Sequence, residues 1–156
     1  MAVKRILTFG EKTLERVSRK VEKIDSETLE LIRDMKDTLT AAPGIGLAAP
    51  QIGVLKKVIY INFKDGETEF ILMNPKITGR SGTERDAEGC LSYPNYEGIV
   101  DRPRKVTVTG IDEKGRAVVV EGEGFLARAL CHEIDHLDGV LYTKRARKIY
   151  KLEEEK

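Results

Sequence analysis

The chain has 156 residues, and 27 Lys and Arg nearly balance 26 Asp and Glu. That length suits one domain with its own core, and the balanced charge argues against a dedicated nucleic-acid-binding protein. The sequence shows no apolar run suited to a signal peptide or a membrane span, so we expect a cytoplasmic protein without membrane contact, whose two cysteines do not form a disulfide.

The first predicted element is an amphipathic helix over residues 26–42. Its apolar residues recur at three- or four-residue spacing after Asp25 and Ser26, two good N-caps. Pro43 and Gly44 then end the helix.

The glycine-rich stretch "GIGLAAPQIG" covers residues 44–53. It follows a helix rather than a strand and is not succeeded by Gly-Lys-Ser/Thr, so a phosphate-binding loop is a weak reading. Its small residues instead let the backbone approach a ligand closely, and Gln51 adds one amide that both donates and accepts.

Two β-hairpins are predicted from alternating, β-rich runs. The first joins residues 57–63 and 70–75 through "KDGETE", and the second joins residues 105–112 and 116–122 through "EKG". Helices separated by antiparallel hairpins predict an α+β fold rather than a parallel doubly wound sheet.

Both histidines of the chain lie in "CHEIDHLDG", on a predicted helix from residue 125 to about 137. At about 100° per residue, His132 and His136 are roughly 40° apart and about 6 Å apart along the axis, so both reach one ion. Glu133 lies beside the ion, where a carboxylate can take a proton from activated water. The alternative is an exposed helix face with incidental histidines.

A third ligand must come from elsewhere in the chain. Cys131 is turned about 120° from the imidazoles, which favours a buried, inert thiol. Asp138 and the acidic tail are poorly suited, so Cys90 in "EGCLSYP" is the best candidate, although a small core residue near a turn explains it too. We expect Pro94 to keep this segment from becoming a central strand. Three ligands would leave a vacant position, as catalytic zinc sites do.

Taken together, "GIGLAAPQ", "EGCLS" and "HEIDH" resemble the three signature motifs of the peptide deformylases, and the likeness covers nearly the whole chain. The resemblance is to the shorter bacterial type. It implies one catalytic domain over residues 1–156, with antiparallel sheets packed around a central metal-binding helix. It also implies a hydrolase whose substrates are N-formylmethionyl peptides and nascent polypeptides. The enzyme would release formate from their N-terminal formylmethionine.

The resemblance assigns site residues by position. It implies three metal ligands, Cys90, His132 and His136, for one divalent ion, with Fe²⁺ expected and Zn²⁺, Ni²⁺ or Co²⁺ as substitutes. It implies Glu133 as general acid/base, and the Gln51 amide and the Leu91 N–H as donors to the oxyanion.

Further residues are expected around the substrate. Ile45, Gly46 and Gly89 would line the peptide groove, and Glu88 and Arg102 would brace the cysteine segment, with a surface salt bridge as the alternative. Phe125 and Ala129 suit an apolar pocket for methionine, although core packing explains them equally well. We expect Arg128 at the rim, facing peptide carbonyls.

Two features depart from the family pattern. Cys131 replaces a residue that is commonly Gln, and the tail beyond "HLDG" is short. We expect residues 144–156 to form a short, fraying helix because the basic part comes first, against the helix dipole. Its "KRARK" run allows transient ribosome association, although a solvated helix end explains it better.

Three competing functions stay open. A metalloprotease or aminopeptidase would use the same water chemistry with a different third ligand. A non-catalytic metal module would need a fourth ligand. A thiol hydrolase built on Cys90 and His132 would be active without metal.

Overall fold

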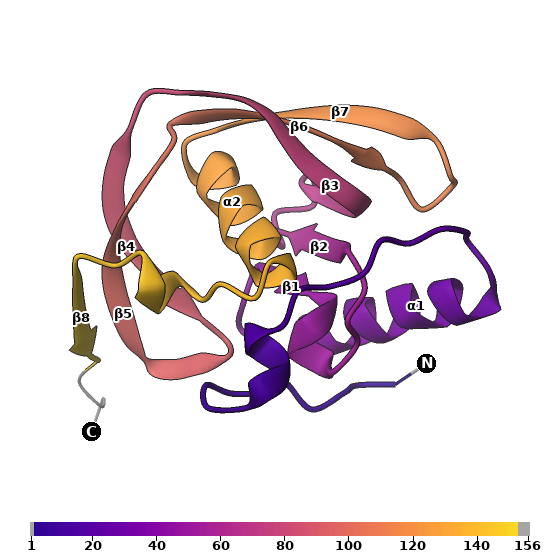
Figure 1. Cartoon of the computed structure of the whole chain (residues 1–156), viewed down its shortest axis with the longest axis horizontal. Coiled ribbons are helices and arrows are strands. Elements are labelled where there is room, and N and C mark those ends of the chain that lie inside the picture. The colour runs from indigo at the N-terminus through magenta and orange to yellow at the C-terminus, as the bar shows by residue number, and fades with distance from the viewer. Residues whose placement is uncertain (1, 153–156) are drawn as a thin grey trace.

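The computed structural model describes residues 2–152, in which two antiparallel sheets flank a helix (Figure 1). The five-stranded sheet has the order β1-β2-β3-β6-β7, formed by Gly46–Ala48, Val58–Asn62, Glu69–Ser81, Lys105–Ile111 and Ala117–Glu123. The three-stranded sheet has the order β4-β5-β8, formed by Glu84–Cys90, Tyr93–Arg102 and Lys148–Lys151. The helices are α1 (Ser26–Thr40), α2 (Phe125–Leu137) and the short 3-10 turns η1 (Lys12–Glu15), η2 (Ala49–Ile52) and η3 (Tyr142–Lys144).

Helix α1 begins and ends close to where its sequence predicts. The Asp25 side chain accepts a hydrogen bond from the Thr28 N–H at 3.0 Å, which satisfies one free donor of the first turn. The helix ends at Thr40, three residues before Pro43. Its buried face, including Met35 and Leu39, packs on the five-stranded sheet.

Strand β2 is buried on both faces, which explains why its residues are almost all apolar. Val58 and Tyr60 belong to the core shared with α1, whereas Ile59 and Ile61 belong to the core shared with α2. This alternation follows from the two-residue period of a strand. The two helices therefore cover opposite faces of one sheet.

Helix α2 lies between the two sheets, with the five-stranded sheet on one side and β4 and β5 on the other (Figure 1). Leu130, Ile134 and Leu137 pack into the core of the five-stranded sheet. Strand β7 approaches closely at Gly122, where a Cβ would lie 2.9 Å from Leu130 Cδ1. The α+β fold with antiparallel sheets around a central helix is confirmed.

Two local predictions were wrong. The basic segment after η3 does not form a helix: residues 148–151 form β8, which pairs with β5 through Gly98↔Ile149 and Glu97↔Tyr150. Strand β5 is the central strand of its sheet despite Pro94. Pro94 is the second residue of β5 and precedes the residues that pair with β8. Its missing N–H therefore interrupts no hydrogen bond between β5 and β8.

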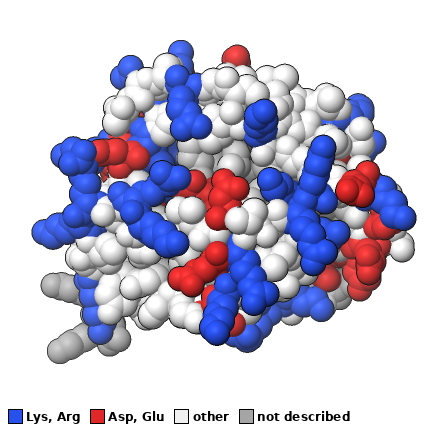
Figure 2. All heavy atoms as spheres, in the orientation of Figure 1, with Lys and Arg blue, Asp and Glu red and all other residues white. Residues whose placement is uncertain are grey.

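Residues 153–156 of the predicted tail helix lie outside the described residues, and the assignment of residues 1–156 to one catalytic domain stays a prediction. Within residues 2–152, no helix is both long and apolar enough to cross a membrane. On the face seen in Figure 2, basic and acidic side chains are interspersed. Several partly exposed charges of the protein form ion pairs, such as Arg145 with Asp135 and Arg147 with Asp101.

Candidate active site

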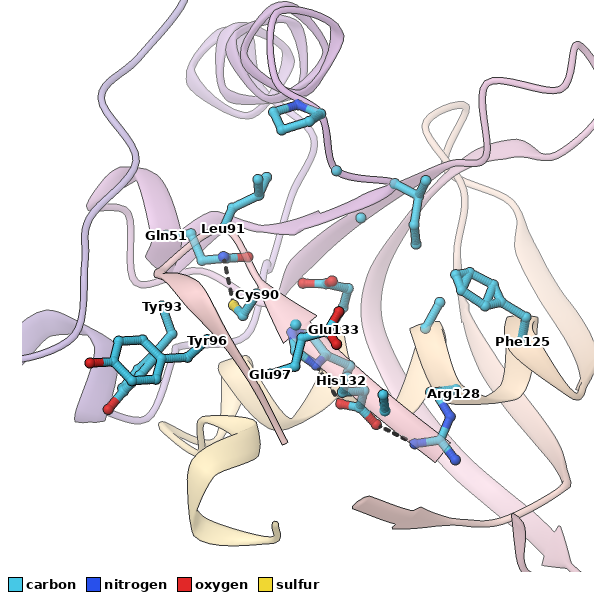
Figure 3. Close-up of a pocket in the computed structure, with 18 of the residues that line it drawn as sticks. Gln51, Cys90, Leu91, Tyr93, Tyr96, Glu97, Phe125, Arg128, His132 and Glu133 are labelled. Atoms are coloured by element: carbon cyan, nitrogen blue, oxygen red, sulfur yellow. Dashed lines mark hydrogen bonds and ion pairs between the residues drawn. The ribbon is translucent and has the colours of Figure 1, made fainter. Parts of the chain in front are cut away.

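A pocket of about 500 Å³ opens where β1, β4, β5 and α2 meet. We call the part of the pocket lined by Cys90, His132 and Glu133 its inner end, and Figure 3 shows these residues close together. A register shift between Glu88 and Cys90 ends the regular pairing of β4 with β5. That irregularity turns the thiol toward α2.

The structure brings together the three side chains that the resemblance names as ligands. The sulfur of Cys90 and one ring nitrogen each of His132 and His136 all lie within 4.8 Å of one another. Cys90 Sγ is 3.3 Å from His136 Nε2. Within residues 2–152 no fourth His, Cys, Asp or Glu joins this group.

Glu88 orients His132 from behind. Its Oε1 lies 2.7 Å from His132 Nδ1, and because a carboxylate only accepts, Nδ1 carries the hydrogen and the Nε2 lone pair faces the cluster. Arg102 donates to both Glu88 oxygens, at 2.8 and 2.9 Å. Burial by itself raises the pKa of Glu88, but the hydrogen bonds from Arg102 and His132 outweigh it and hold that pKa well below its usual value.

The predicted rim position of Arg128 is wrong. Its side chain is 8% exposed, and its guanidinium donates to Glu88 Oε2 at 2.7 Å and to the carbonyls of Val100 and Glu84 at 3.0 and 2.8 Å. These bonds tie α2 to β4 and β5. Arg128 therefore lies in the pocket wall and directs its charge toward Glu88, because the buried carboxylate and two carbonyls satisfy its donors better than solvent at a rim would.

Glu133 is buried beside the cluster, and β1 makes room for it. A Cβ on Gly46 would lie 2.6 Å from Glu133 Oε2, so only glycine lets the carboxylate sit there without displacement. Oε1 has no hydrogen-bond partner among the described residues. Burial raises the pKa of Glu133 to about 7, an increase that the neighbouring His132 and Arg102 limit.

Gln51 is held from both ends. Its Oε1 accepts from the Ala48 N–H at 2.9 Å, which directs its amide nitrogen toward the Cys90 segment. Nε2 donates to Ser92 Oγ at 3.0 Å and to Cys90 Sγ at 3.6 Å, the contact drawn in Figure 3. Leu91 lines the same pocket.

The remaining predicted substrate residues also line this pocket. Ile45 and Gly46 come from the β1 side, Gly89 from β4, and Phe125 and Ala129 from α2. Phe125 is 58% exposed and lies against Phe63, with ring centroids 5.2 Å apart. Its partial exposure places it at the mouth of an apolar recess rather than inside the core.

Cys131 lies away from the ligand cluster, on the side of α2 that packs into the core. Burial raises the pKa of its thiol. Both observations agree with a thiol held in its inert form.

Three residues near the site escaped sequence reasoning. Ser92 accepts from Gln51 and its N–H lies 3.4 Å from Cys90 Sγ, yet a serine beside the motif cysteine has no distinctive spacing. Asp135 bonds Arg102 at 2.6 Å, and its position three residues after His132 was the available signal. The ring of Tyr142 stacks at 6.1 Å on His132, a contact that no local pattern predicts.

Comparison with known proteins accords with this arrangement. The sequence model of the polypeptide deformylase family matches residues 3–152. The chain belongs to the peptide deformylase family. It is therefore an enzyme of the class that deformylates nascent chains, a hydrolase of protein biosynthesis.

Relatives cover the family domain nearly end to end. The chain is 52% identical to peptide deformylase 2 of Clostridium perfringens over 99% of both chains, and 48% identical to peptide deformylase 1 of Clostridium acetobutylicum over 93% of this chain and 95% of that one. The crystal structure of the Ehrlichia chaffeensis peptide deformylase in complex with actinonin has a TM-score of 0.90 at 36% identity, covering 95% and 91% of the two chains. That of Legionella pneumophila has a TM-score of 0.89 at 39% identity, covering 92% and 86%.

A catalytic metal belongs to this family, and the donors found here suit one. One soft sulfur and two imidazole nitrogens form a set that binds zinc or iron. His132 is already oriented through Glu88, as metal-bound histidines usually are. The half-buried Cys90 and the buried His132 and His136 therefore form a chemically sound metal site.

Proposed function

We propose that this enzyme removes the formyl group from the N-terminal formylmethionine of nascent polypeptides and releases formate. The proposal rests above all on Glu133, a carboxylate buried beside three convergent metal-binding side chains. Such a carboxylate has no structural partner for its Oε1 in the described chain, and a reacting water would supply one.

Cys90, His132 and His136 would hold one divalent metal ion. Bound there, the ion would act as a Lewis acid that lowers the pKa of water. Fe²⁺ is our expected ion, with Zn²⁺, Ni²⁺ and Co²⁺ as substitutes. The mixed sulfur and nitrogen donors support this range without selecting one metal.

Glu133 acts first as the base. Its pKa of about 7 keeps a substantial fraction ionised at neutral pH, so it accepts a proton from the water that attacks the formyl carbon. The carbon–nitrogen bond then breaks, and Glu133 delivers the proton to the departing amine. Formate and a free N-terminus result.

Gln51 and Leu91 stabilise the oxyanion that forms during attack. The Gln51 amide is preoriented by Ala48, so its hydrogen now directed at Cys90 Sγ can turn to a substrate oxygen with little cost in entropy. The Leu91 N–H is the second donor. A single donor of this kind contributes about 3–4 kcal/mol to transition-state stabilisation.

The methionine side chain occupies the recess lined by Ile45, Phe125 and Ala129. Its apolar walls suit an unbranched thioether, and Gly46 and Gly89 leave the backbone open for hydrogen bonds to an extended peptide. Glu88, Arg102 and Arg128 support this wall from behind.

The basic segment of residues 144–148 offers a small positive surface for transient association with ribosomes. Arg145 and Arg147 are engaged with Asp135 and Asp101. Within residues 2–152, Lys144 and Lys148 are the basic residues of that segment without an ion pair, so they are the ones available to contact phosphate. The segment therefore supplies a weak electrostatic contact at most.

The test is formate release from formyl-Met-Ala-Ser by protein purified without air, with bound metal measured. We expect turnover that a chelator abolishes and Fe²⁺ restores. Turnover that persists without metal and stops on alkylation would favour the thiol hydrolase. Cleavage of unformylated peptides instead would favour the aminopeptidase.

The two cysteines provide a matched pair of variants. Cys90→Ser should lower bound metal to well below one equivalent, because an alcohol is a much poorer ligand than a thiolate. Cys131→Ser should retain the metal. If Cys131→Ser loses the metal and Cys90→Ser keeps it, the assigned ligand set is wrong.

A further inference from the structure

The outer end of the pocket is built from a different part of the molecule than the inner end. Its lining residues come from β5 and the segment after β8: Tyr93, Asn95, Tyr96, Glu97 and Leu152. Figure 3 shows Tyr93 and Tyr96 on the opposite side of Cys90 from Phe125 and Arg128. This end therefore lies away from the recess assigned to methionine.

Glu97 is the uncompensated acidic group of this pocket. Glu88 is neutralised by Arg102 and Arg128, and Glu133 is buried beside the ligand cluster. Glu97, by contrast, is half-buried and accepts one hydrogen bond, from Tyr150 O–H at 3.0 Å. No Lys or Arg within residues 2–152 forms an ion pair with it.

The nearest basic residue along β8 does not change this. Lys151 pairs opposite Tyr96, whereas Tyr150 pairs opposite Glu97. Because successive side chains of a strand point to opposite faces, Lys151 is directed to the face away from Glu97. The carboxylate therefore keeps an acceptor position open toward the pocket.

Aromatic rings line the same end of the pocket. Tyr96 precedes Glu97 in β5, so by the same alternation its ring lies on the other face of the strand, where it meets Tyr93 edge to face at 5.2 Å. Phe9 stacks on Tyr93 at 4.1 Å. A lysine or arginine side chain has an apolar stem, which suits these apolar walls, and a charged end, which suits the Glu97 carboxylate.

The position of Gly89 tells which substrate residue reaches Glu97. A Cβ on Gly89 would lie 3.7 Å from Glu97 Cγ and from the Tyr96 carbonyl oxygen. With methionine in the recess by Phe125 and Ala129, an extended peptide running toward the Tyr93 end of the pocket would pass Gly89 at the following residue. The side chain of the second residue is then the one within reach of Glu97.

We propose that Glu97 makes this enzyme favour nascent chains whose second residue is lysine or arginine over those with an acidic second residue. The inference rests on the proposed deformylase function and adds a preference at the position after methionine. Glu97 binds the substrate here and takes no part in the proton transfers.

The test compares formyl-Met-Lys-Ser, formyl-Met-Ala-Ser and formyl-Met-Glu-Ser with the metal-loaded enzyme at low salt. We expect kcat/KM to fall in that order, by about fivefold at each step, mainly through KM, as expected for one partly exposed charge contact. Raising the salt to about 1 M should compress the series because it screens the contact.

Glu97→Gln keeps the shape and the acceptor for Tyr150 but removes the charge, so the ratio of kcat/KM for the Lys and Glu peptides should fall close to one. Glu121→Gln is the matched control, since Glu121 is an exposed glutamate on β7 that does not line this pocket. It should retain the wild-type ratio.

Two outcomes would overturn the inference: equal kcat/KM for the three peptides, or the same loss of preference in Glu121→Gln as in Glu97→Gln. If either result occurs while formyl-Met-Ala-Ser is still cleaved, the deformylase function stands. Absence of cleavage of every formylated peptide would instead refute that function.

Discussion

The two ends of the pocket are constructed on opposite principles. At the inner end Glu88, His132 and Glu133 are each less than 10% exposed, and two arginines saturate the carboxylate that orients the histidine. At the outer end Leu152 is 41% exposed, and Glu97 has one neutral partner. A buried carboxylate paired as Glu88 is holds the reacting groups in one geometry, whereas a half-buried carboxylate with one neutral partner remains available to a substrate.

Among substitutions at the inner end, we expect the one at Glu133 to lower activity most. Glu133→Ala removes the proposed acid/base and is expected to lower kcat by about 10³-fold or more while the metal content stays near the wild-type value. Stopped assays of formate release with metal analysis would measure both. Turnover within tenfold of wild type would remove Glu133 from the mechanism.

Arg128 tests whether the paired network also stabilises the fold. Arg128→Met should lower the free energy of unfolding by about 3 kcal/mol, because Glu88 loses one of two buried cations and two backbone carbonyls lose their donor. Chemical denaturation of the metal-loaded protein would measure it.

Arg85→Met is the matched control for that variant. Arg85 is 58% exposed and pairs with Asp101 on the surface, so its loss should leave the denaturation midpoint nearly unchanged. Equal effects of the two substitutions would contradict the distinction between buried and exposed charge.

Substitution of Tyr150 at the outer end should have the smallest effect of these variants. Tyr150→Phe removes the hydrogen bond to Glu97 and should lower the melting temperature by no more than about 2 °C, because one partly exposed neutral donor is replaced by water. The preference for lysine at the second residue should persist, since Glu97 keeps its charge. Loss of that preference would show that Tyr150 positions the carboxylate.

The elements that the sequence predicted correctly are those whose signals are local. Helix α1 and its Asp25 cap, strands β2 and β3 and the hairpin of β6 and β7 follow from spacing and turn residues. The face of α2 that carries His132 and His136 likewise follows from helical geometry. The assigned roles of the site residues stay predictions until the variants are measured.

The failures have one physical cause. Residues 148–151 form a strand because the edge of β5 offers hydrogen bonds to them, and that edge is set by residues about 50 positions earlier. Arg128 was placed at the rim because its charge suggested exposure, but it lies one helical turn before His132 and so faces the same buried Glu88. A charged side chain can be buried where an oppositely charged partner lies close to it, and the fold determines which residues lie close together.

The sequence by itself determined the set of reactive side chains: two histidines one turn apart and a glutamate on one helix, and a cysteine elsewhere in the chain. These side chains could be identified because periodicity and donor chemistry are local properties. Only the tertiary structure decided that Cys90 meets these histidines, that Arg102 and Arg128 share Glu88, and that Glu97 stands open at the far end of the pocket. Those contacts join segments more than a dozen residues apart, so they depend on the packing of the sheets around α2.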